Sequence, residues 1–138
     1  IGIASQAVGI AQGAWDHAYR YAKEREAFGK TINNLQAIRF MFSEMQTEID
    51  AARLLTYHAS LAQDRGEKFT RAAAHAKLYS SEVAMRSTVK CVQIFGGYGY
   101  VTDYPAERYM RDAKITEIYE GTSEIQRLVI ANSLLKDQ

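Results

Sequence analysis

Proline is almost absent from this sequence, because Pro105 is the only one in 138 residues. Since proline breaks helices, and apolar residues recur at helical spacing along most of the chain, we expect long helices rather than strands and turns. The single cysteine, Cys91, cannot form an internal disulfide. The chain also lacks a secretory leader pattern and a run of about twenty apolar residues, the length that spans a bilayer. These absences favour a soluble protein of a reducing compartment.

An excess of charge of one sign is also missing, since 17 basic and 16 acidic residues give a formal net charge of +1. Without clustered basic residues, neither nucleic acid nor a membrane is an expected partner. The histidines, His17, His58 and His75, lie far apart and have no second histidine or cysteine at ligand spacing, so no metal site is expected. The glycines at 96–99 follow a predicted helix, not a strand, which argues against a dinucleotide-binding turn.

The hydrophobic content of 47% is enough for one domain with a continuous core. Apolar spacing predicts a first helix over about 2–25, a loop, and a second helix from about residue 35 to a stop at 64–66. A third, alanine-rich helix should run from an N-cap at Thr70 to Phe95. A short helix from Ala106 to about Tyr119 and a last one from a capping box at Ser123 and Gln126 complete an all-α up-down bundle.

Glu120 is the acidic residue best placed for chemistry, because it lies between Tyr119 and Gly121 at an element boundary. In an apolar cleft its carboxyl pKa would rise towards neutrality, which suits a general base. A solvated glutamate next to a helix start is the alternative. Arg25 is equally open, since it is either a ligand contact or an exposed charge at a helix end. The aromatic residues around the glycine loop would either line a planar ligand or simply pack over the loop.

Three motifs decide between these alternatives. Residues 110–127, MRDAKITEIYEGTSEIQR, closely resemble the signature of acyl-CoA dehydrogenases. Residues 24–29, EREAFG, with Leu35-Gln36 downstream, and residues 93–97, QIFGG, followed by Tyr104-Pro105, agree with that family in order and spacing. Essentially the whole chain resembles the C-terminal domain of the short-chain (butyryl-CoA) branch.

The resemblance implies a flavoprotein with an N-terminal helical domain, a middle β-domain and a C-terminal helical bundle, assembled as a homotetramer built from two dimers. Residues 1–138 would be that C-terminal bundle, without the other two domains. The start of the chain agrees, because Ile1 is already in helical register with no initiator methionine or capping residue before it. By itself, such a piece is expected to be inactive.

The resemblance also assigns residues to the cofactor, FAD. In the family, the Glu-Arg-x-x-Phe-Gly motif and the Gln-Ile-Phe-Gly-Gly loop contact the adenosine-pyrophosphate part of FAD bound mainly by the neighbouring subunit. The three residues after the catalytic Glu-Gly pair also contact the cofactor. In this sequence the contacts correspond to Arg25, Phe28, Gln36, Gln93, Ile94, Phe95, Gly96, Gly97, Thr122, Ser123 and Glu124.

Glu120 matches the family's catalytic base, and Tyr119 and Gly121 are expected to contact the acyl-CoA substrate. The implied mechanism polarises the thioester carbonyl through the Glu120 amide and a flavin ribityl hydroxyl. Glu120 takes the α-proton, flavin N5 accepts the β-hydride, and a trans-2-enoyl-CoA forms. Electrons would pass to an electron-transfer flavoprotein, in the cytoplasm of a bacterium or the mitochondrial matrix of a eukaryote.

Other readings remain beside this one. A branched or dicarboxylic acyl-CoA substrate, or an oxidase that uses oxygen, would share the same signature. The isovaleryl-CoA branch is disfavoured because it has a small residue where this chain has Glu120. A helical interaction module without chemistry is the alternative outside enzymes, although Glu120, Arg25 and the Gln93 loop are not needed to pack a bundle.

Overall fold

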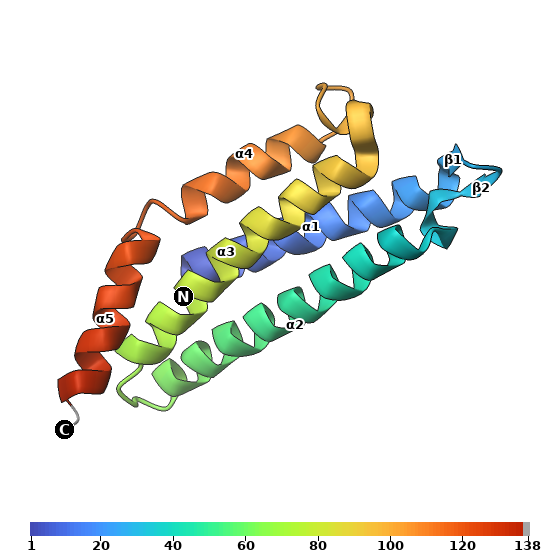
Figure 1. Cartoon of the computed structure of the whole chain (residues 1–138). Helices are drawn as coiled ribbons and strands as arrows, with labels where there is room; N and C mark the ends of the chain where they lie inside the picture. The colour runs from blue at the N-terminus through green and yellow to red at the C-terminus, as the bar shows by residue number, and fades with distance from the viewer. Residues whose placement is uncertain (137–138) are drawn as a thin grey trace.

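The computed structural model describes residues 1–136, and five α-helices account for most of them: α1 (Gly2–Glu24), α2 (Gln36–Asp64), α3 (Thr70–Phe95), α4 (Ala106–Thr116) and α5 (Ser123–Lys136). Figure 1 shows α1, α2 and α3 running side by side in alternating directions, with α4 returning along α3 and α5 bending away. Among these helices α3 is central, because it contacts each of the other four. The predicted all-α up-down bundle is confirmed.

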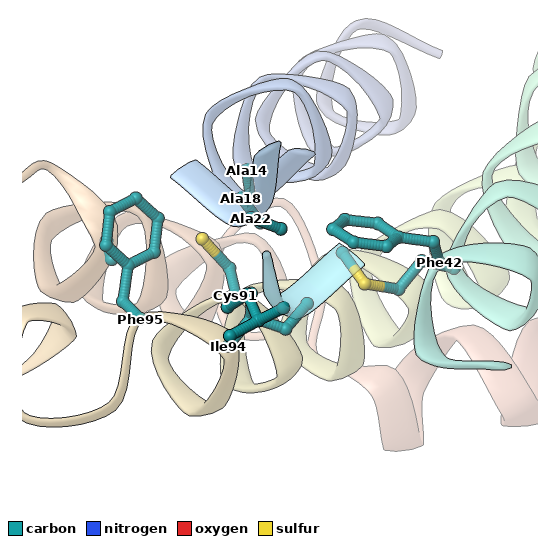
Figure 2. Close-up of a cluster of buried hydrophobic side chains, with 10 residues drawn as sticks. Ala14, Ala18, Ala22, Phe42, Cys91, Ile94 and Phe95 are labelled. Atoms are coloured by element: carbon teal, nitrogen blue, oxygen red, sulfur yellow. The ribbon is translucent and has the colours of Figure 1, made fainter. Parts of the chain in front are cut away.

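Alanine lets α1 approach α3 closely. Every buried residue of α1 is an alanine, at positions 4, 7, 11, 14, 18 and 22. Figure 2 shows Ala14, Ala18 and Ala22 of α1 facing Cys91 and Ile94 of α3, with Phe42 and Phe95 on either side. Small side chains at three- and four-residue spacing leave room for larger residues opposite, so the core is filled mainly from α2 and α3.

Helical spacing predicts an apolar face in α2 that includes Met45 and Ile49, and one in α5 that includes Ile125, Leu128 and Leu135. In α2, Met45 and Ile49 are fully buried, as the spacing predicted. In α5, by contrast, Ile125, Leu128 and Leu135 are 48%, 58% and 69% exposed. The apolar positions of α5 therefore form a surface of this chain rather than part of its core.

A small β-hairpin replaces the loop predicted after the first helix. Strands β1 (Glu26–Ala27) and β2 (Lys30–Thr31) pair antiparallel, with Phe28 and Gly29 both at positive φ in the two-residue turn. This is the backbone of a type I′ turn, which the sequence conceals because Phe-Gly is not one of its usual dipeptides. A 3-10 helix, η1 (Ile32–Asn34), then leads into α2, and a second, η2 (Gly96–Gly99), follows α3.

Two predicted caps were wrong by one residue. The N-cap of α3 is Phe69, without a side-chain cap, and Thr70 is already helical. At α5, Ser123 is the first helical residue, and the hydroxyl of Thr122 accepts the hydrogen bond from the Ile125 amide at 3.4 Å. Since α4 ends at Thr116 rather than near Tyr119, residues 117–122 form a separate connection, here called the Glu120 turn.

Candidate functional site

A cavity of about 510 Å³ opens where the C-terminal ends of α1 and α3 meet. Its lining includes Arg25 of the α1 end, residues 94–97 and Tyr98. The rings of Tyr21 and Phe95 stack at a centroid distance of 4.2 Å, and the Arg25 guanidinium lies 5.8 Å from the centre of the Tyr98 ring. The cavity thus combines aromatic side chains with one basic residue, Arg25, and one acidic residue, Asp103.

Two glycines shape the loop at this cavity. Gly96 ends α3 with φ at +62°, a conformation that residues with a side chain rarely adopt. Gly99 packs so tightly on α3 that a Cβ would lie 2.7 Å from the carbonyl oxygen of Val92. The glycine-rich segment is therefore a tight reversal of the chain that places Tyr98 beside Arg25.

The cavity gathers part of the predicted cofactor set. Arg25, Ile94, Phe95, Gly96 and Gly97 all line it. The remaining three predicted residues of this group do not, and all are exposed elsewhere: Phe28 at the hairpin tip, Gln36 at the start of α2, and Gln93 on α3. A guanidinium beside stacked rings could hold an anionic group next to a planar one, which fits the pyrophosphate and adenine parts of FAD.

Glu120 borders a second cavity, of about 530 Å³, between the N-terminal ends of α1 and α3 and the start of α5. Lys77, Gln126 and the apolar residues Ile3, Phe69 and Val129 also line it. Lys77 lies in the N-terminal half of α3 and Phe95 at its C-terminal end. At a rise of ~1.5 Å per residue the two are about 27 Å apart along the helix. The Glu120 cavity and the Arg25 cavity are therefore distinct.

Glu120 has an unusual backbone. Among the described residues, only Phe28 and Glu120 have positive φ without being glycine, at +54° and +55°. Gly121 follows at +92°, so two consecutive residues are left-handed. Such strain persists only where neighbouring groups hold it, and it is common at functional sites.

Side chains from two helices hold this turn. Lys77 Nζ of α3 donates to the Gly121 carbonyl at 2.7 Å. Gln126 Nε2 of α5 donates to the carbonyls of Glu120 and Gly121 at 3.2 and 3.3 Å. Ser123 N–H closes the turn by donating to the Glu117 carbonyl at 3.0 Å.

Burial lowers the pKa of Lys77 from its ordinary value, and the nearby carboxylates of Glu117 and Glu124 partly offset that shift. The sequence interpretation did not assign a site role to Lys77 or Gln126. A signal was present for Lys77, which lies within the alanine- and serine-rich buried face of α3, where lysine is rare unless it has a partner.

The other predicted contacts lie at the end of the Glu120 turn and the start of α5. Thr122, Ser123 and Glu124 line a small cavity of about 250 Å³, together with Lys114 and Arg127. The pKa of the Glu124 carboxyl lies below its ordinary value, because its own backbone amide and the Thr122 hydroxyl hydrogen bond to it. The Ser123 hydroxyl is buried without a hydrogen-bond partner in the described structure.

The predicted substrate residues flank Glu120 but differ in their contacts. The Tyr119 hydroxyl donates to the side-chain carbonyl of Gln6 on α1. Gly121 is half-buried, and its carbonyl is the acceptor for Lys77. The turn is thus tied to three helices of the bundle.

Known proteins resemble the chain over nearly its full length. The profile described as "Acyl-CoA dehydrogenase, C-terminal domain" matches residues 1–135. The mitochondrial short-chain specific acyl-CoA dehydrogenase of Bos taurus is 57% identical over 136 residues, covering 99% of this chain and 33% of that protein. The caffeyl-CoA reductase-Etf complex subunit CarC of Acetobacterium woodii is 49% identical, covering 99% of this chain and 36% of that one.

Solved structures of acyl-CoA dehydrogenases and related proteins also match the fold of this chain. A chain in the structure described as the electron transferring flavoprotein of Acidaminococcus fermentans superimposes with a TM-score of 0.97 at 55% identity, over 98% of this chain and 36% of that one. Butyryl-CoA dehydrogenase from Megasphaera elsdenii gives 0.96 at 51% identity, over 97% and 35%. This chain spans about one third of the length of these relatives. The chain belongs to the acyl-CoA dehydrogenase family, in which it corresponds to the C-terminal domain.

Proposed function

We propose that this chain is the C-terminal domain of a longer, FAD-dependent enzyme that oxidises a short-chain acyl-CoA to the trans-2-enoyl-CoA, with Glu120 as the base. Family membership supports the class of reaction, and the similarity to the short-chain and butyryl-CoA enzymes supports the substrate length. One observation carries the choice of residue: Glu120 is the acidic residue whose strained backbone is held in place at the edge of a cavity.

Glu120 would remove the α-proton with its carboxylate. Its backbone N–H would donate to the thioester carbonyl and so stabilise the negative charge that develops when the proton leaves. Tyr119 and Gly121 would contact the acyl group on either side. The Glu120 side chain is exposed in this chain, so its apolar surroundings would come from the substrate and the other domains of the enzyme.

When bound, FAD supplies the acceptor for the hydride that leaves the β-carbon. Arg25, Ile94, Phe95, Gly96 and Gly97 would hold the pyrophosphate and adenine, since they combine a guanidinium, aromatic walls and backbone free of side chains. The cavity that these residues line is distinct from the Glu120 cavity. They would therefore bind an FAD molecule whose reactive flavin ring lies next to the catalytic glutamate of another subunit.

The remaining cofactor residues would contact FAD from their own positions. Thr122, Ser123 and Glu124 follow the Glu120-Gly121 pair. They would contact the FAD molecule that accepts the hydride when Glu120 of the same subunit removes the proton. Phe28, Gln36 and Gln93 project from the surface of this chain, so their contacts would be to a cofactor held by another domain or subunit.

We further propose a homotetramer built as a dimer of dimers. Other domains or subunits would cover the exposed apolar residues of two helices, which are Phe40, Leu54 and Tyr57 of α2 and Leu128 and Leu135 of α5.

Among the described residues, every helix is too short or too polar to span a membrane. Electrons would pass from the reduced FAD to an electron-transfer flavoprotein. The descriptions of two similar proteins mention such a partner. The enzyme would work in the bacterial cytoplasm or, in a eukaryote, in the mitochondrial matrix.

Steady-state kinetics of the full-length protein test this function. The protein should purify with FAD and give its highest kcat/KM with butyryl-CoA in a series of straight-chain, branched and dicarboxylic acyl-CoA esters. A higher value for a branched or dicarboxylic ester would reject the short-chain assignment. Turnover with oxygen alone would identify an oxidase. No turnover with any ester would support a helical interaction module.

A further inference from the structure

Lys77 has a role that packing does not require. It lies within α3, and only 5% of its surface is exposed. A buried lysine is costly unless its ammonium group has hydrogen-bond partners. The partner here is a backbone carbonyl, that of Gly121, at 2.7 Å and 44 residues further along the chain. The lysine therefore connects the central helix of the bundle to the Glu120 turn.

The position of that bond matters because of the backbone beside it. Glu120 and Gly121 are both left-handed, and in an ordinary extended or helical backbone the Glu120 side chain would point elsewhere. The two carbonyls lie on either side of the Gly121 Cα atom, so fixing them limits rotation about the Gly121 backbone bonds and holds the peptide plane that directly follows Glu120. Gln126 binds both carbonyls from α5, whereas Lys77 binds Gly121 from α3. The turn is thereby held from two directions.

The Lys77 bond differs from the Gln126 bonds in strength and in its anchor. It is shorter and its donor carries a charge, which makes a hydrogen bond stronger than one between neutral groups. It also starts from α3, the helix packed against each of the other four, whereas α5 lies at the edge of the bundle. Lys77 therefore fixes the turn to the helix that packs against all the others.

We infer that Lys77 is a positioning residue: by holding the Gly121 carbonyl, it keeps Glu120 in the left-handed conformation that aims its carboxylate at the substrate. This inference rests on the proposed role of Glu120 as the base. Lys77 itself is assigned no contact with substrate or cofactor and no proton transfer. Its effect should therefore be on the rate of α-proton removal rather than on the affinity for acyl-CoA.

Lys77→Met in the full-length, FAD-containing enzyme tests this directly, because methionine keeps the length of the side chain and removes the donor. Flavin bleaching by butyryl-CoA, followed by stopped flow, should slow by about 10- to 100-fold at saturating substrate, the scale expected when a reacting group is misplaced. The acyl-CoA concentration that gives half the limiting rate and the FAD content should change little. Lys77→Gln, which keeps a shorter donor, should recover part of the rate.

Lys90→Met is the matched control. Lys90 is on the same helix and also forms one hydrogen bond of 2.7 Å, but to the side chain of Glu44 at the surface. This variant should bleach at the wild-type rate. If Lys77→Met is as fast as Lys90→Met, Lys77 does not position the base.

A double-mutant cycle separates this inference from the function it rests on. If Lys77 acts through Glu120, then Lys77→Met should cause no further slowing in a Glu120→Gln background. Equal slowing in both backgrounds would overturn the inference. A wild-type rate in Glu120→Gln alone would instead remove the proposed function itself. Should Lys77→Met fail to fold, Lys77→Gln is measured in its place, and a wild-type rate in that variant would also overturn the inference.

Discussion

Gly121→Ala is the smallest change that should disturb the candidate site, since it adds one methyl group. Gly121 has φ at +92°, and an alanine forced towards the left-handed region costs about 1–2 kcal/mol. The new Cβ would also lie 2.7 Å from Gln126 Nε2, which must move away. That movement breaks hydrogen bonds to two carbonyls, each worth about 1 kcal/mol. We therefore expect a loss of about 2–4 kcal/mol in the free energy of unfolding.

Urea unfolding of residues 1–138, followed by circular dichroism at one protein concentration, measures this loss. Gly9→Ala is the matched control, because Gly9 lies within α1 where an added Cβ meets nothing within 4 Å. Alanine there should stabilise the chain by about 0.5–1 kcal/mol through helix propensity. The same chemical change should thus have opposite signs at the two sites. A Gly121→Ala chain within about 0.5 kcal/mol of wild type would refute the argument that the turn is strained and held.

Three further predictions concern the chain by itself. Residues 1–138 should be strongly helical but purify without colour, because the cavity at Arg25 offers only part of a flavin-binding surface; stoichiometric yellow flavin with dehydrogenase activity would show this to be wrong. The chain should self-associate through its exposed apolar residues such as Leu54 and Leu128, whereas a stable monomer at high concentration in analytical ultracentrifugation would count against the tetramer. Burial raises the pKa of Cys91 to about 12, so its thiol should react with a maleimide at pH 8 only after unfolding; rapid labelling of the native chain would contradict the packing of α1 on α3.

The helices could be predicted from sequence because their signals are local. In α2, the spacing of Phe42, Met45 and Ile49 is enough to place a buried face. In α1 the same reasoning placed Ile3 and Ile10 in one stripe with Ala7, Ala14 and Ala18. The three alanines are fully buried, whereas the two isoleucines are only half-buried, although alanine carries the weaker hydrophobic signal. Which face of a helix packs most closely depends on its neighbour, and periodicity alone does not contain that information.

The candidate site was predictable only where a motif carried it. Composition and spacing alone left Glu120 between a base and a solvated side chain, and only the resemblance to a family favoured the base, which stays a prediction. The left-handed backbone at Glu120 and the bond from Lys77 were not predictable, because the residues are 43 positions apart in the sequence and meet only when α3 packs beside the turn. Local rules also gave the wrong cap for α5, where Thr122 takes the place expected for Ser123.

The identity of the base is the central claim, and Glu120→Gln in the full-length enzyme tests it most directly. Glutamine keeps the size of the side chain and removes the proton acceptor, so flavin bleaching on addition of butyryl-CoA without an electron acceptor should slow by at least about 10²- to 10⁴-fold. Acyl-CoA should still bind. Glu117→Gln, which changes the nearest carboxylate in the turn, should retain most of the rate, since the Glu117 side chain is engaged with Lys114 at 2.6 Å. Bleaching of the Glu120→Gln enzyme at a near wild-type rate in stopped flow would contradict the assignment.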